Sequence, residues 1–105
     1  MDCAMGLVEE IAGQIGIPLT RRGSLILVSA DNALKLLDGC ESVGLRILGV
    51  EGFQVKESSI VPDMDAIADF SNLDSAIASI REARRLIHIV RPHELVFDFT
   101  VAEPK

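Results

Sequence analysis

Apolar residues recur at helical spacing near both ends of the chain's first half. The first stretch covers residues 1–15 and stops at Gly16. A second stretch follows Ser29 or Asp31, either of which can cap a helix N-terminus through its side-chain oxygen, and Gly44 suits the position after the helix. We therefore predict two amphipathic helices in this half.

The second half contains a third helical pattern and an alternating strand. The periodicity begins at Ser71 and ends before Pro92, which cannot continue a helix. From Glu94 to Val101, every second residue is a large apolar one, and the positions between are Glu94, Val96, Asp98 and Thr100, the pattern of a half-exposed strand. The buried positions are Leu95, Phe97, Phe99 and Val101.

Two continuous apolar runs indicate buried strands. They cover residues 24–29 and 45–50, and the second run continues through Phe53 and Val55. Residues 56–59 form a turn signal, and Ile60–Val61 begins a short return strand. The next segment, residues 62–70, is compatible with a loop, a helical turn or an irregular edge strand.

These elements predict a single α+β domain over residues 1–105. An N-terminal helix is followed by the ferredoxin-like βαββαβ order, with three to four strands and the helices packed mainly on one face. The two dense apolar strands are expected at the centre. The first helix packs across a sheet edge or against a second subunit.

Composition restricts the partners. The formal net charge is −6, which repels nucleic acid and anionic membranes and favours a basic protein partner. The alternative interpretation is that acidity only keeps the protein soluble. We expect no nucleic acid and no membrane partner, and a homodimer stays open.

The cysteines and the N-terminus point to the cytoplasm. Cys3 and Cys40 both fall at apolar positions of predicted helices, which favours reduced, buried thiols. Glu9 and Glu10 interrupt the first apolar stretch, so it does not read as a signal peptide, and no run is long enough to span a membrane.

No motif for catalysis or cofactor binding is present. His88 and His93 flank Pro92, and a solvated helix end explains them better than a hidden nucleophile–base pair. Asp63, Asp65 and Asp69 could hold a weak Mg²⁺ site, but they lack the glycine and final glutamate of a calcium loop, and an acidic loop is the preferred reading. We therefore predict no catalytic residues, no metal and no cofactor.

Charge is distributed unevenly. Gly49 and Gly52 lie within a strand and surround Glu51, which either points to a wet face at a bulge, the preferred reading, or is aimed at a ligand. Five acids and no base occur from Glu57 to Asp74, whereas four arginines face one glutamate from Arg81 to Arg91. These groups form two separate surfaces or pair with each other.

The stretch from Asn32 to Ser71 resembles small acidic immunity proteins of bacterial polymorphic-toxin systems. The resemblance lies in the helix ALKLLDGCESVGL leading into ILGVEGF, then a short hairpin, and a proline followed by an acidic stretch ending in DFS. It implies a non-catalytic protein that neutralises a basic toxin by occluding it with an acidic surface. The contacts would be Glu51, Glu57, Asp63, Asp65 and Asp69. The arginines from Arg81 to Arg91 depart from an all-acidic surface.

Two other functions remain open. The ferredoxin-like order resembles that of ACT-type modules, which sense small molecules, and a ligand would then bind near residues 29–32. The last alternative is an enzyme whose pocket is assembled from dispersed residues, which no motif supports.

Overall fold

The computed structural model describes residues 4–102 of the chain, with side chains from residue 6 onward. In chain order the elements are α1 (Ala4–Ile15), β1 (Thr20–Arg22), β2 (Leu25–Ser29), α2 (Ala30–Ser42), β3 (Ile47–Lys56), β4 (Ser59–Asp69), α3 (Ala76–Val90), the 3₁₀ turn η1 (Arg91–His93) and β5 (Val96–Val101).

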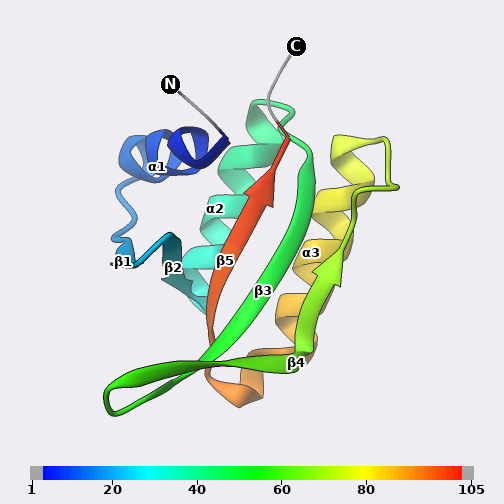
Figure 1. The fold of residues 1–105 in the computed structure, drawn as a ribbon. Coiled ribbons are helices and arrows are strands. Elements are labelled where there is room, and N and C mark those ends of the chain that lie inside the picture. Colours follow the sequence, from blue (N-terminus) through cyan, green and yellow to red (C-terminus); the bar gives the residue numbers. More distant parts are fainter. Residues whose placement is uncertain (1–3, 103–105) are drawn as a thin grey trace.

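The strands form one antiparallel sheet in the order β1-β2-β5-β3-β4. Figure 1 shows α2 and α3 side by side on one face of the sheet. Within the described residues no helix covers the other face, which we call the open face. The α+β class and the helices on one face are as predicted.

The strand count and the central strand differ from the prediction. The sheet has five strands within residues 4–102, rather than three or four, because Thr20–Arg22 pairs with Leu25–Leu27 as a short outer strand. The half-polar β5 holds the centre, between β2 and β3. A central strand can be half polar here because only one face of the sheet is covered.

Residues 62–70 belong almost entirely to β4, which makes the return strand much longer than Ile60–Val61. The helix expected from Ser71 begins instead at Ala76, and the hydroxyl of Ser75 accepts the Ala78 N–H at 3.1 Å. Residues 71–75 turn first, because the Asp69 carboxylate accepts the Ser71 N–H at 2.8 Å and Leu73 N–H bonds the Phe70 carbonyl.

Several predictions are confirmed. The hydroxyl of Ser29 accepts the Asn32 N–H at the start of α2, and Gly44 follows the helix with φ 70°, a value that favours glycine. β5 buries Phe97, Phe99 and Val101 on one face. Cys40 is buried in the core as expected, whereas Cys3 lies outside the described residues.

Helix α1 packs against α2 and β5. Its apolar face buries Val8, Ile11 and Ala12, and Ile11 reaches the space above Gly39 of α2, where a Cβ would lie 2.7 Å from its Cγ2. α1 therefore extends the helical layer, which settles the position of the first helix within this chain. No helix among the described residues is long and apolar enough to cross a membrane.

Candidate functional site

The five acidic residues selected from the sequence all lie on one long hairpin formed by β3 and β4. We call residues 47–69 the acidic hairpin. Glu51 is on β3, Glu57 is in the turn, and Asp63, Asp65 and Asp69 are on β4. The hairpin extends along and beyond the sheet edge (Figure 1). Lys56 is the only basic residue in the hairpin, so the hairpin carries a strong negative charge.

Strand register places Glu51 on the open face. Its neighbour Val50 is buried and pairs with buried Phe99, whereas Glu51 pairs with Ile67 on one side and Asp98 on the other. Since consecutive residues of a strand point to opposite faces, Glu51, Ile67 and Asp98 share the open face. The register also shifts between Glu51 and Phe53, so Glu51 is an exposed charge beside a bulge. This agrees with the prediction that Glu51 points to a wet face at a bulge.

Asp98 is an acidic member of this surface that sequence reasoning missed. β2 and β5 share only two residue pairs, and beyond them the Asp98 carboxylate accepts the Ile26 N–H at 3.1 Å. Partial burial raises the pKa of Asp98, and the nearby Glu51 charge adds to the effect, although the Ile26 hydrogen bond opposes it. A signal existed, because alternation in β5 already places Asp98 on the wet face.

The opposed carboxylates predict a stability cost. Like charges directly opposite across a strand pair are destabilising, so Glu51→Gln should raise the free energy of unfolding at pH 7 by roughly 0.2–0.5 kcal/mol, the low part of the usual range because Glu51 is exposed. Denaturation with urea would measure the difference, with the exposed turn residue changed by Glu57→Gln as the control.

The increase in the free energy of unfolding expected for Glu51→Gln should depend on pH. A carboxyl group whose pKa is raised in the folded protein favours folding while it is protonated, and loses that contribution as the pH rises through its folded pKa. Removing the Glu51 charge should therefore stabilise the protein more at pH 7 than near pH 3, because acid protonates the Asp98 carboxyl group and removes the charge that Glu51 repels. An equal gain at both pH values would contradict repulsion between the two carboxylates.

The register shift is a bulge of four residues in β4. Glu51 pairs with Ile67 but Phe53 pairs with Pro62, so residues 63–66 lie opposite Gly52 alone. Ala66 points inward and is fully buried over Gly52. The bulge gives the DMDA segment a defined conformation, which explains why its sequence pattern is neither a regular strand nor a loop.

Asp63 is the anchor of the bulge. Its side chain is 9% exposed; Oδ1 accepts the Asp65 N–H at 2.9 Å, and Oδ2 lies 3.0 Å from Nδ1 of His93 and 3.5 Å from Nε2 of Gln54. The hydrogen bond with His93 is the main cause that lowers the pKa of Asp63. His93 reaches the bulge from η1 and was missed as its partner, because 30 positions separate the two residues.

Asp69 does not join Asp63 and Asp65. Its carboxylate accepts the Ser71 N–H at 2.8 Å, and hydrogen bonds from Ser71 lower its pKa. The three aspartates considered as a Mg²⁺ site are therefore split between the bulge and the end of β4. Carboxylate and ring-nitrogen atoms of Asp63, Asp65 and His93 instead lie within 4.8 Å of one another.

The acidic hairpin also exposes much apolar surface. Eight large hydrophobic side chains among the described residues are exposed, and the hairpin carries four of them. These four are Val55, Val61, Met64 and Ile67. Met64, at 80%, is the most exposed of all and lies between Asp63 and Asp65. Exposed apolar side chains gathered among charges are typical of a surface that binds another protein.

The arginines lie elsewhere and are partly neutralised by α2. Arg84 donates to Asp38 and Glu41 at 2.5 and 2.7 Å, and Arg91 pairs with Asp31. No lysine or arginine among the described residues pairs with an acid of the hairpin. The sequence left open whether the acids and the arginines pair with each other or form two separate surfaces. Arg84 of α3 and Arg91 of η1 pair with acids of α2, and the hairpin acids form a separate acidic surface.

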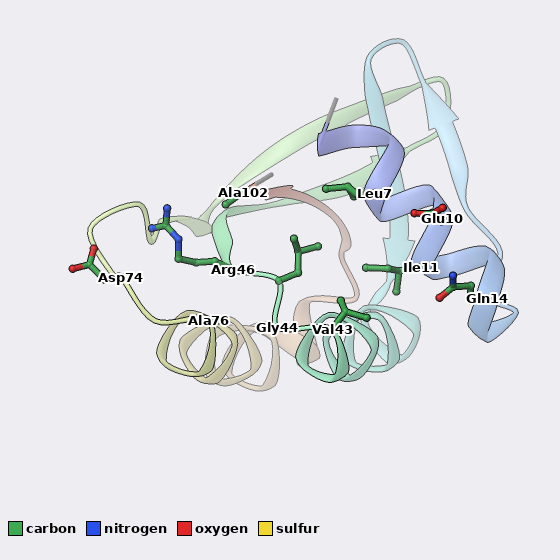
Figure 2. A pocket seen from close by; sticks show the side chains of 11 residues that line it. Leu7, Glu10, Ile11, Gln14, Val43, Gly44, Arg46, Asp74, Ala76 and Ala102 are labelled. Atoms are coloured by element: carbon green, nitrogen blue, oxygen red, sulfur yellow. The ribbon is translucent and has the colours of Figure 1, made fainter. Parts of the chain in front are cut away.

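A cavity of about 420 Å³ lies away from the acidic hairpin's tip, between α1 and the ends of α2 and α3. Figure 2 shows Leu7 and Ile11 on one side and Val43 and Ala76 below, with Arg46 and Asp74 toward the rim. The Arg46 guanidinium already donates to the carbonyls of Ser71 and Leu73, at 3.3 and 3.0 Å. The cavity walls are thus mainly apolar.

The turn that the sequence predicted as a small-molecule site lies at a different place from this cavity. Near residues 29–32 the hollow measures about 330 Å³, and the Asp31–Arg91 ion pair lies on it. Cys40 is buried, and burial raises the pKa of its thiol to about 11, so it is not ionised at neutral pH.

Comparison with protein-family models, curated proteins and solved structures gives no match to this chain. The resemblance to immunity proteins therefore stays a prediction.

Proposed function

We propose that this chain is a non-catalytic protein-binding domain whose acidic hairpin and open face bind a basic protein. The observation that carries the proposal is the hairpin's composition: five acids and four exposed apolar side chains on one element, with no pairing lysine or arginine among the described residues. Acids draw a basic partner by long-range attraction, and apolar side chains stabilise the complex once water leaves.

The partner contacts side chains of the open face rather than adding a strand to the sheet. β4 is an edge strand, but Pro62 has no N–H to donate and the bulge over residues 63–66 interrupts the line of backbone groups. Proline, bulges and charges are the features that protect sheet edges from pairing. Facing like charges would also oppose pairing between the hairpins of two copies.

The specific form of the proposal is an immunity protein in the cytoplasm, which occludes a basic toxin. Occlusion needs a rigid surface with complementary charge and no reacting groups of its own. Glu51 and Asp69 stand at paired positions of the β-hairpin, which supply such a support, and Asp65 stands in the bulge between them. Glu57 extends the charge to the turn.

Charge reversal on the open face tests the proposal. Glu51→Lys with Asp65→Lys changes two exposed acids and leaves the partly buried Asp63 intact. The matched control is Glu10→Lys with Asp74→Lys, which makes the same change in net charge at exposed positions around the cavity. All three proteins should unfold at similar temperatures.

Immobilised proteins are exposed to extract from the cells that produce the chain, and bound proteins are compared by mass spectrometry. We expect one basic protein on wild type and control, at least tenfold less on the face variant, and weaker binding at about 0.5 M salt because of screening. Equal retention by all three proteins, or no basic protein that distinguishes them, would overturn the proposal.

The alternative is an ACT-like domain that senses a small molecule. One observation favours it: a cavity of about 420 Å³ falls within the size range of ligand sites. A rise in melting temperature with an amino acid or nucleotide, abolished by filling the cavity with Ala76→Phe, would support this function.

A further inference from the structure

The geometry points to a divalent transition-metal site, formed by Asp63, Asp65 and His93, that would join the β4 bulge to η1. The sequence alone favoured no metal, because the three aspartates lack the glycine and final glutamate of a calcium loop. The fold replaces Asp69 by an imidazole from a different element. This site is separate from the proposed protein-binding function and does not depend on it.

Two of the three ligands are already in place. Nδ1 of His93 and Oδ2 of Asp63 are 3.0 Å apart, close to the separation of two ligands on one tetrahedral ion with bonds of about 2.0–2.2 Å. Asp63 is held by the Asp65 N–H, and Pro92 limits the backbone freedom next to His93. The ion takes the place of the proton shared by these two side chains.

Asp65 completes the set with a small movement. All three ligand atoms lie within 4.8 Å, and Asp65 is exposed, so its carboxylate can rotate toward the other two without disturbing the core. Three protein ligands leave a fourth position for water. Two carboxylates also balance the charge of a divalent ion, whereas without an ion they repel each other.

The imidazole determines the class of metal. Mg²⁺ and Ca²⁺ prefer oxygen ligands throughout, whereas Zn²⁺ and its neighbours bind imidazole together with carboxylate. The only described cysteine is not a competing ligand, because Cys40 is buried and its thiol pKa is about 11. Zn²⁺ is therefore the appropriate probe.

Zinc titration of the full-length chain tests the site. The background carries Cys3→Ser, so that this thiol cannot bind the ion, and His93→Ala and Asp65→Asn remove one ligand each. The matched control is His88→Ala, since His88 is the other histidine and is exposed on α3. Calorimetry at pH 7 gives stoichiometry and affinity, and amide NMR shifts locate the ion.

We expect one Zn²⁺ per chain, shifts centred on residues 63–65 and 93, and at least tenfold weaker binding in both ligand variants, with the control unchanged. Absence of binding, equal losses in the His88 and His93 variants, or Mg²⁺ binding as strong as Zn²⁺ and insensitive to His93→Ala would each overturn the inference. If His93→Ala unfolds, His93→Gln replaces it. Because no partner protein is present, a failure here leaves the proposed binding function standing.

Discussion

Gly52→Val should lower the free energy of unfolding by about 3 kcal/mol, the upper part of the usual cost of overpacking. A Cβ at Gly52 would lie 2.5 Å from the Cβ of Ala66, 3.1 Å from Leu95 Cδ1 and 3.3 Å from Phe97 Cε2. Ala66 cannot rotate away, because its Cβ is fixed to the backbone of the bulge. Urea denaturation monitored by circular dichroism measures the change.

The sign of this effect separates packing from propensity. Valine is favoured and glycine disfavoured in strands, so β-propensity alone predicts that the substitution stabilises the protein. The control is Gly13→Ala in α1, where a Cβ would meet nothing within 4 Å, and we expect a gain of about 0.5–1 kcal/mol. A stable Gly52→Val protein would mean that the bulge does not pack against β3 as described.

Local patterns predicted the elements whose structure is decided locally. α2 has its capping serine, its apolar stripe and its terminal glycine within the same 16 residues, and β5 alternates without interruption. The start of α3 was predicted wrongly because Ser71 and Ser75 are both residues that can cap a helix. In the structure the Asp69 carboxylate accepts the Ser71 N–H in a turn, and Ser75 caps the helix instead.

The sequence left an irregular edge strand as one of three alternatives for residues 62–70, and β4 is such a strand. The choice could not be made from the sequence because the irregularity of β4 is relative to another strand. Four residues of the bulge oppose Gly52, so the two-residue alternation changes phase inside the strand, and Pro62 adds a signal against strand structure. Yet Gly52 itself was a local sign. A glycine within an apolar strand was correctly associated with a bulge beside Glu51.

The site was predicted in part for the same reason. The hairpin acids are near one another in sequence, so their common surface could be foreseen. Asp98 and His93 come from the far end of the chain, and their places beside Glu51 and Asp63 depend on strand register and on where α3 ends. Neither the strand register nor the end of α3 can be predicted from the spacing of residues within one segment.

Ser79→Ala should lower the free energy of unfolding by about 1–3 kcal/mol, although it removes a single oxygen atom. Ser79 is fully buried in α3, and its hydroxyl accepts the Ile47 N–H at 2.9 Å and donates to the Ala76 carbonyl at 3.0 Å. The β3–β5 register shifts just after Ile47, so the hydroxyl supplies the partner that this buried amide needs.

Amide exchange gives a second measurement of the same contact. The Ile47 N–H should exchange much faster in Ser79→Ala, whereas Ser42→Ala, which removes an exposed hydroxyl bonded to the Gly39 carbonyl, should change stability by less than about 0.5 kcal/mol. Similar losses in both variants would show that the buried amide does not depend on Ser79. Gly52 acts at the middle of β3, where it admits the bulge, and Ser79 acts at its start, which it fixes on α3. Together they would set which hairpin side chains reach the open face, so each variant should also alter the environment of Glu51.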